Sequence, residues 1–275
     1  MIARYAGGET GARAAALAGS VVVVVDAFRA STTIAVLVAR GARVVPVASI
    51  EEAASAPADL RIGERGSAKV AGFDFGNSPT EVLAAEVPPG ATVALSTTNG
   101  TRVLEAAAGS PAIYAAAFVN AGAMAEELAG AEDITVVGCG WEGGRASEDE
   151  DAAGAILSRM ERRGASLDAR ARRIVEGYLG RPAGALRNNS AARRLKRLSY
   201  EKDLEFCLSE DTVPVAPRLV SGAFVGDRKG GESLAAGPNK NAEFILDTEV
   251  VRLYSAVSQG GSNVTSSAQP NTKRR

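Results

Sequence analysis

The sequence contains no histidine among its 275 residues. Histidine is the most common general base near pH 7, so its absence excludes Ser-His-Asp and Cys-His catalysis and every histidine-containing zinc site. Carboxylates, cations, hydroxyls or thiols must therefore carry any chemistry. The two cysteines, Cys139 and Cys207, are too few for a disulfide framework or a four-cysteine zinc site. We expect both to be free thiols in a reducing compartment.

Long apolar runs are also missing. The longest, residues 112–119, is far shorter than the roughly 20 residues that span a bilayer. Residues 1–6 lack the basic and apolar regions of a secretory signal. The net charge of −1 argues against a general attraction to nucleic acid or anionic lipid. We therefore expect a cytoplasmic protein that binds neither nucleic acid nor membrane, with a homo-oligomer as an open possibility.

Short apolar runs alternate with alanine-rich stretches of helical period. This βαβα pattern is typical of a parallel sheet covered by helices on both faces. Ser49, Ser78 and Ser147 each precede a glutamate by three residues and predict helix starts, whereas Gly41 predicts a helix end. We predict a three-layer α/β/α fold with a largely parallel or mixed sheet. Its strands are expected near residues 20–26, 43–48, 59–63, 91–96, 112–116, 133–139 and 213–217.

The composition changes after Val225, where small and polar residues become frequent. We predict one domain over residues 1–225 and a flexible C-terminal tail over residues 226–275. Residues 159–202 carry thirteen Lys and Arg against four acidic residues, which fits either a nucleic-acid surface or solvated helices. The scarcity of aromatic side chains for base stacking favours solvated helices.

Polar residues follow several of the predicted strands. Asp26, Arg29 and Ser31 follow the first strand, Glu64 follows the third, and residues 96–102 and 139–149 follow two later strands. Because the carboxyl ends of parallel strands share one edge of a sheet, these groups should converge. A rim of carboxylates, arginines and helix N-termini suits a phosphorylated substrate held together with a hard divalent cation.

These features also have structural interpretations. Asp26 could be a turn former or helix cap, Asn99 begins a common Asn-Gly turn, and residues 148–151 could complement a helix dipole. Cys139 and Arg145 have the Cys-x5-Arg spacing of thiol-dependent phosphatases, so a cysteine nucleophile is an open alternative. No G-x-x-x-x-G-K-[ST] segment occurs, which excludes a P-loop nucleotide hydrolase.

Two segments are more specific than the rest: G-F-D-F-G-N-S-P at residues 72–79 and T-T-N-G-T at residues 97–101. Together with residues 25–33, 118–120 and 148–154, they resemble the successive motifs of the 2-phosphosulfolactate phosphatase family. The resemblance runs from about residue 20 to residue 217. It implies a Mg2+-dependent hydrolase that converts 2-phospho-3-sulfolactate to 3-sulfolactate and phosphate, a step toward coenzyme M.

The resemblance and the predicted rim together suggest catalytic roles. We expect Asp26, Asp74 and Asn99 to take part in catalysis, with Asp74 equally able to fix its own loop. No side chain is identified as the nucleophile, and a water molecule activated by the metal fits the absence of histidine. The expected Mg2+ ligands are Asp26, Glu64, Glu148 and Asp149.

Substrate recognition is expected from cations and hydroxyls of the same rim. Arg29 and Arg102 would bind the phosphate and the sulfonate, and Ser31 and Thr98 would add neutral donors. Two other functions are open: a phosphatase for another small phosphorylated organic acid, and an anion-binding protein without turnover. The presence of all the candidate metal carboxylates favours an enzyme.

Overall fold

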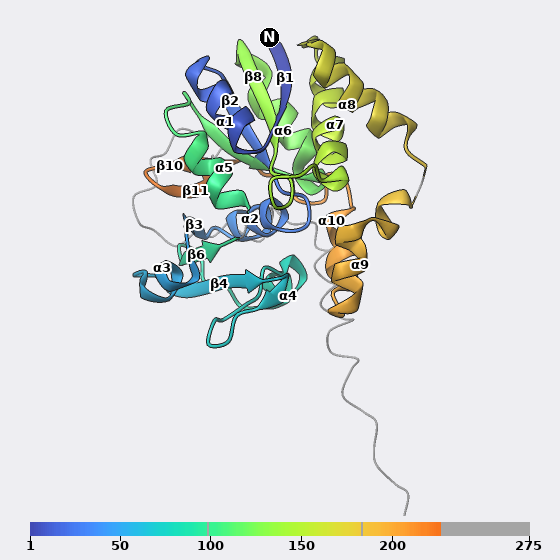
Figure 1. The fold of residues 1–275 in the computed structure, drawn as a ribbon. Helices are drawn as coiled ribbons and strands as arrows, with labels where there is room; N and C mark the ends of the chain where they lie inside the picture. Colours follow the sequence, from blue (N-terminus) through green and yellow to red (C-terminus); the bar gives the residue numbers. More distant parts are fainter. Residues whose placement is uncertain (98, 183, 227–275) are drawn as a thin grey trace, which may run out of the picture.

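Five consecutive valines form β2 (Val21–Val25), which lies inside the sheet between β7 (Ile113–Ala116) and β8 (Asp133–Gly138). Alternate side chains of β2 enter different cores: Val22 and Val24 pack against helices on one face, and Val23 and Val25 against helices on the other. A strand that is buried on both faces is apolar throughout, which explains the absence of alternation here. The predicted three-layer α/β/α arrangement is confirmed (Figure 1).

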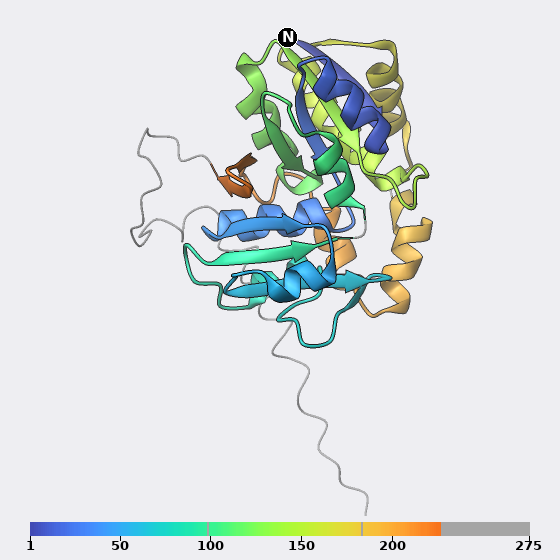
Figure 2. The same ribbon diagram turned by 60° about the vertical axis from the view of Figure 1, so that its left-hand side comes forward.

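The computed structural model describes residues 1–97, 99–182 and 184–226. Within them, eleven strands form one sheet in the order β5-β4-β6-β3-β11-β10-β7-β2-β8-β1-β9. The antiparallel hairpin β10–β11 joins two largely parallel groups, pairing with β7 on one side and with β3 on the other. Figures 1 and 2 show these groups running at a large angle to each other. The remaining strands are β1 (Ile2–Gly7), β3 (Arg43–Val47), β4 (Leu60–Arg65), β5 (Ala68–Lys69), β6 (Thr92–Ser96), β9 (Ser166–Leu167), β10 (Pro217–Val220) and β11 (Ala223–Gly226).

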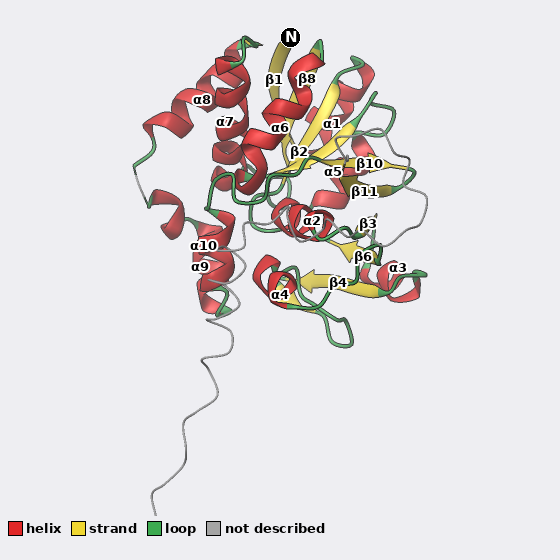
Figure 3. Ribbon diagram, turned by 180° about the vertical axis from the view of Figure 1, so that it is seen from behind, coloured by secondary structure: helices red, strands yellow, loops and turns green. Residues whose placement is uncertain are grey.

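Helices α1 and α5 cover one face of the group around β2, and α6, α7 and α8 cover the other (Figures 1 and 3). Helix α2 follows β2 and packs against both β7 and β3, so it lies across the junction of the two groups. The helices are α1 (Gly8–Leu17), α2 (Ala30–Ala39), α3 (Ile50–Ser55), α4 (Pro79–Ala84), α5 (Gly100–Ala106), α6 (Ala121–Glu127), α7 (Ser147–Arg162), α8 (Ala169–Gly180), α9 (Ser190–Arg197) and α10 (Glu201–Cys207), with short 3-10 turns at Phe118–Asn120, Leu128–Gly130 and Ala185–Asn188.

Three of the predicted helix boundaries are confirmed. The hydroxyl of Ser49 accepts a hydrogen bond from the backbone N–H of Glu52 at 3.0 Å, and that of Ser78 accepts one from Glu81 at 3.2 Å. Both serines therefore satisfy backbone donors that the first helical turn leaves unpaired. Gly41 ends α2 with a φ of 81°, a conformation that favours glycine.

Other predictions are corrected. Ser147 is the first residue of α7 rather than its cap, and its hydroxyl accepts a hydrogen bond from Asn189 at 3.1 Å. The strand predicted over residues 213–217 is wrong: the N–H of Val213 donates to Val119 in a loop, and β10 begins only at Pro217. Strand β1 was not predicted, because its Ala- and Gly-containing sequence carries little of the β-branched signal.

The domain predicted over residues 1–225 stays a prediction. Gly226 pairs with Pro217 in the hairpin, so it belongs to the sheet. The tail predicted beyond it falls, from residue 227 on, outside the described residues. Among the helices of the described part of the chain, none is long and apolar enough to cross a membrane.

Candidate active site

A small pocket, here called the inner pocket, lies at the carboxyl ends of β2, β4, β6 and β8. Its position agrees with the rule that ligands bind beyond these strand ends in parallel sheets. The volume is about 20 Å³, enough for about one water molecule or one ion. Six of the residues predicted from the sequence line it: Asp26, Arg29, Glu64, Asn99, Glu148 and Asp149.

Asp26 follows β2 and is held at the start of the next turn. Its Oδ1 accepts a hydrogen bond from the backbone N–H of Ala30 at 3.3 Å, and its own N–H donates to the Ser31 hydroxyl at 3.0 Å. The pKa of Asp26 is raised to about 6: burial is the largest cause and the carboxylates of Glu64 and Glu148 add to it, whereas the hydrogen bond from Ala30 opposes it. The turn role considered for Asp26 is present, but it leaves a carboxylate facing the pocket.

Asp149 comes from the first turn of α7 and connects two strand ends. Its Oδ1 accepts from the N–H of Ala27 at 2.9 Å, and its Oδ2 accepts from the N–H of Gly140 at 2.8 Å. Burial raises the pKa of Asp149, and the charges of Asp26 and Glu148 add to this effect. The side chain therefore ties the loops after β2 and β8 together and adds negative charge at the pocket.

Glu64 and Glu148 also line the inner pocket. Glu64 accepts a short hydrogen bond from the N–H of Ser67, in the turn between β4 and β5. Glu148 accepts one from Nδ2 of Asn189 at 2.7 Å, at the start of α9. Burial raises the pKa of Glu148, whereas the positive charge of Arg194 lowers it. The turn between β4 and β5 thus holds Glu64 in place, and the start of α9, which is distant in the sequence, holds Glu148.

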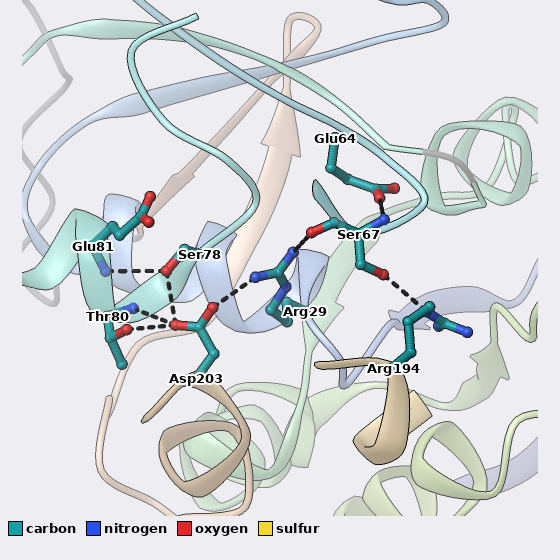
Figure 4. A network of polar contacts seen from close by, with 8 residues as sticks. All are labelled: Arg29, Glu64, Ser67, Ser78, Thr80, Glu81, Arg194 and Asp203. Carbon is teal, nitrogen blue, oxygen red and sulfur yellow. Dashed lines mark hydrogen bonds and ion pairs between the residues drawn. The ribbon is translucent and has the colours of Figure 1, made fainter. Parts of the chain in front are cut away.

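Figure 4 shows the network that fixes Arg29. Its Nη1 donates to Oδ2 of Asp203, and its Nη2 donates to the carbonyl of Ser67, both at 2.7 Å. Asp203 also accepts from the hydroxyl of Ser78 at 2.8 Å and from the N–H of Thr80 at 3.2 Å. Arg29 and Asp203 are almost fully buried, with 2% and 0% of their side chains exposed. Arg29 therefore connects α10 to the Ser67 turn, and its predicted contact with the phosphate or sulfonate stays a prediction.

Arg194 on α9 was missed by sequence reasoning, although it lies in the basic segment of residues 159–202. Its Nε donates to the hydroxyl of Ser67 at 2.9 Å, and its guanidinium carbon lies 3.7 Å from the centre of the Trp141 ring. Both Arg194 and Trp141 line the inner pocket. The sequence indicated only that residue 194 is positively charged, because no local pattern places it beside residues 67 and 141.

Three further polar, uncharged side chains line the inner pocket: Asn77, Thr97 and Asn99. Asn99 accepts a hydrogen bond from the N–H of Glu142 at 3.3 Å. Asn77 and Thr97 are 4% and 8% exposed, and Oδ1 of Asn77 and Oγ1 of Thr97 have no hydrogen-bond partner among the described residues. A buried polar atom without a partner is costly, so such atoms at a pocket wall are suited to a ligand.

Three other predicted residues do not line the inner pocket. Ser31 is buried behind Asp26, where its hydroxyl donates to the carbonyl of Val24 at 3.2 Å. Asp74 is exposed and accepts from the N–H of Arg61 at 2.7 Å, which supports its alternative role of fixing its loop. Arg102 is exposed on α5. Thr98 lies outside the described residues.

The surroundings of Cys139 argue against a thiolate nucleophile. The side chain is buried, and burial raises the pKa of its thiol well above the usual value, with the charges of Asp26 and Asp149 adding to the effect. Arg145, the other half of the Cys-x5-Arg spacing, is 81% exposed and forms two hydrogen bonds to Glu150. The phosphate-binding loop that this spacing would require is therefore absent at this position.

Replacing Cys139 by serine should leave turnover within about tenfold of the original value, because the thiol acts as a small buried side chain. Steady-state phosphate release, measured beside the melting temperature, provides the test. Complete loss of activity in a folded Cys139→Ser protein, with a trapped phosphocysteine in the parent enzyme, would restore the cysteine mechanism.

The acidic residues of the inner pocket do not form a ready-made metal cage. In the part of the chain that the structure describes, no group of three or more Asp, Glu or Cys side chains meets closely enough to hold an ion directly. The hydrogen bonds described above hold the carboxylates apart. Mg2+, however, is usually bound by one or two carboxylates together with water and substrate phosphate, so their oxygen chemistry fits this ion.

The sequence matches a protein-family model described as 2-phosphosulpholactate phosphatase over residues 10–222. A protein of Thermotoga petrophila named "Probable 2-phosphosulfolactate phosphatase" is 41% identical over 207 residues, which cover 74% of this chain and 90% of the relative. A protein of Synechocystis sp. with the same name is 36% identical over 214 residues, which cover 72% of this chain and 88% of the relative. The family match includes every residue that lines the inner pocket.

Proposed function

Because the chain belongs to the 2-phosphosulfolactate phosphatase family, and is therefore a phosphoric monoester hydrolase, we propose that it hydrolyses 2-phospho-3-sulfolactate to 3-sulfolactate and phosphate. We further propose that Mg2+ is its cofactor. The reaction would take place in the cytoplasm as a step toward coenzyme M.

The charge of the inner pocket is the observation that carries this proposal. Four carboxylates but only two guanidinium groups line the pocket. One of these two, Arg29, is already paired with Asp203. A substrate that carries phosphate, sulfonate and carboxylate groups would be repelled by such a surface. A divalent cation between the carboxylates and the phosphate removes this conflict, which supports a metal-dependent reaction.

Asp26 and Asp149 are the best candidates to hold the cation, with Glu64 and Glu148 completing its surroundings. Burial raises the pKa of Asp26 and of Asp149, so their negative charges are poorly compensated in the protein alone. Asn77 and Thr97, whose side-chain oxygens have no hydrogen-bond partner among the described residues, line the same pocket and can bind water or substrate. When bound, Mg2+ would stabilise negative charge on the phosphate and lower the pKa of a nearby water molecule.

The protein's own contribution is to position these groups. Asp149 holds the loops after β2 and β8 through two backbone N–H groups, and the Arg29–Asp203 pair holds the Ser67 turn that in turn fixes Glu64. Such fixed dipoles and charges need little reorganisation during the reaction. Arg194 brings a positive charge to the edge of the pocket.

Phosphate release should depend on a divalent cation. Exhaustive treatment with EDTA should abolish hydrolysis of 2-phospho-3-sulfolactate, and adding Mg2+ or Mn2+ should restore it, because the available ligands are oxygens. The same cations should raise the melting temperature, since a ligand that binds only the folded state stabilises it. Full activity after chelation, together with a melting temperature that does not change when Mg2+ is added, would contradict the role of the metal.

The substrate is tested separately with a panel of phosphorylated hydroxy acids, with and without sulfonate groups. The highest kcat/KM is expected for 2-phospho-3-sulfolactate. Equal or better turnover of an ester without a sulfonate would replace this substrate by another small phosphorylated acid while leaving the phosphatase activity in place.

A further inference from the structure

A second cavity, here called the outer pocket, lies beside the inner pocket and has a volume of about 400 Å³. The two pockets share Trp141, Glu148 and Arg194 in their walls. Their charges differ, because arginines outnumber carboxylates in the outer pocket. The charged residues that line it are Arg145, Arg181, Arg194, Glu148 and Glu150.

The sizes of the two pockets indicate which part of a metal–substrate complex each can hold. The inner pocket has room for about one ion or water molecule, whereas the outer pocket has room for a small organic molecule. A substrate whose phosphate reaches toward the carboxylates of the inner pocket would therefore leave the rest of its structure in the outer pocket.

Among the described residues, Arg194 is the arginine of the outer pocket that forms no ion pair with a carboxylate. Arg145 is bonded to Glu150 through two nitrogens, and Arg181 is paired with the buried Asp151. Arg194 uses Nε for Ser67, and among the described residues its Nη1 and Nη2 form no hydrogen bond. The Trp141 ring, 3.7 Å from the guanidinium carbon, restricts the orientation of the guanidinium. A planar guanidinium whose only hydrogen bond among the described residues is to a neutral hydroxyl is suited to an anion with paired oxygens, such as a sulfonate or carboxylate.

We propose that the outer pocket binds the acid group of the substrate that is not hydrolysed, and that Arg194 is the specificity-determining residue that contacts it. The inference rests on the proposed function and deepens it. The preferred substrate class is a small phosphate monoester that carries a strong acid group on a neighbouring carbon. Simple phosphate monoesters lack the group that Arg194 binds, so they should be poor substrates.

The test compares two esters of the same secondary alcohol type, 2-phospho-3-sulfolactate and 2-propyl phosphate, which lacks both acid groups. Substituting Arg194→Met removes the charge but retains a long apolar stem over Trp141. It should lower the ratio of the kcat/KM for 2-phospho-3-sulfolactate to that for 2-propyl phosphate by about 10- to 100-fold, because only the first ester carries the acid groups that Arg194 would bind. The matched control is Arg193→Met. Arg193 is exposed on the same helix and bonds to a backbone carbonyl. The ratio of the two kcat/KM values in Arg193→Met should therefore stay within about twofold of the ratio in the original protein.

Arg145→Gln provides a second variant that should fold, because the side chain of Arg145 is 81% exposed. Its ratio should fall by at least about threefold, because it removes a further positive charge from the outer pocket. A ratio that is unchanged in folded Arg194→Met overturns the proposal. If Arg194→Met does not fold, an unchanged ratio in Arg145→Gln overturns it.

Binding of 3-sulfolactate, measured by calorimetry, separates this inference from the proposed function. If the original protein binds 3-sulfolactate and Arg194→Met does not, the outer pocket binds the acid group. This conclusion holds even if the original protein releases no phosphate from either ester, a result that would reject only the proposed hydrolysis. If the original protein is active and Arg194→Met lowers kcat/KM equally for both esters, the phosphatase activity stands and the acid-binding role of Arg194 is rejected. An original protein that neither binds 3-sulfolactate nor hydrolyses its phosphate ester rejects both.

Discussion

Replacing Asp26 by asparagine should lower kcat for phosphate release by about 100-fold or more while the protein stays folded. The substitution preserves the size of the side chain and the oxygen that accepts from Ala30, but it removes the charge proposed to hold Mg2+. The pKa of Asp26 is raised to about 6, mainly by burial, so the charged form predominates at neutral pH but makes the folded, metal-free protein less stable than a neutral side chain would. The variant should therefore be at least as stable as the original without metal, and should gain less stability from Mg2+.

Asp74→Asn is the matched control, because Asp74 is an exposed residue that binds its own loop outside the inner pocket. Its kcat should stay within about threefold of the original value, since an asparagine oxygen can still accept from Arg61. Comparable losses in both variants would show that the pocket is not the centre of the reaction. An Asp26→Asn enzyme with full activity would remove Asp26 from the proposed metal ligands.

Replacing Asp203 by alanine should destabilise the protein by about 3–5 kcal/mol, because the change leaves the buried guanidinium of Arg29 without its counter-ion. For a protein of this size, such a loss corresponds to a decrease in melting temperature of about 10 °C or more. The hydroxyls of Ser78 and Thr80 also lose their acceptor, which adds to the cost. Thermal unfolding by circular dichroism measures the change.

Glu205→Ala is the control on the same helix. Glu205 forms an ion pair with Arg187 in which both side chains are 47% exposed, and such surface pairs contribute about 0–1 kcal/mol. Its melting temperature should therefore change by no more than about 3 °C. Replacing both members of the buried pair, Arg29→Met with Asp203→Leu, should recover part of the stability that Asp203→Ala loses. Equal decreases for the buried and the exposed pair would show that the network in Figure 4 does not stabilise the fold.

Local signals were sufficient for much of the architecture. The valine run of β2, the caps Ser49 and Ser78, and Gly41 after α2 each depend on interactions within a few residues, and each is observed. Ser147 failed as a cap because its hydroxyl is bound by Asn189, a residue 42 positions away. Long-range partners compete with local capping, and a single sequence does not reveal them.

Within the site, the sequence by itself determined which residue types end the strands. The position of Asp26, Glu64 and Asn99 follows from parallel strands whose carboxyl ends share one edge. Arg29 shows the limit of this reasoning, because the same position predicted its place at the pocket but not its pairing with Asp203.

Only the tertiary structure decided which cations line the inner pocket. Arg102 and Arg194 are indistinguishable by type, yet α5 leaves the first exposed to solvent, whereas α9 packs the second against Trp141 and Ser67. The residues that meet there come from positions 67, 141 and 194, and their approach depends on how α9 and the strand-end loops pack together. Periodicity and spacing describe the chain over a few turns, so they determine the elements and their order, whereas the side chains that meet between distant elements are set by packing in three dimensions.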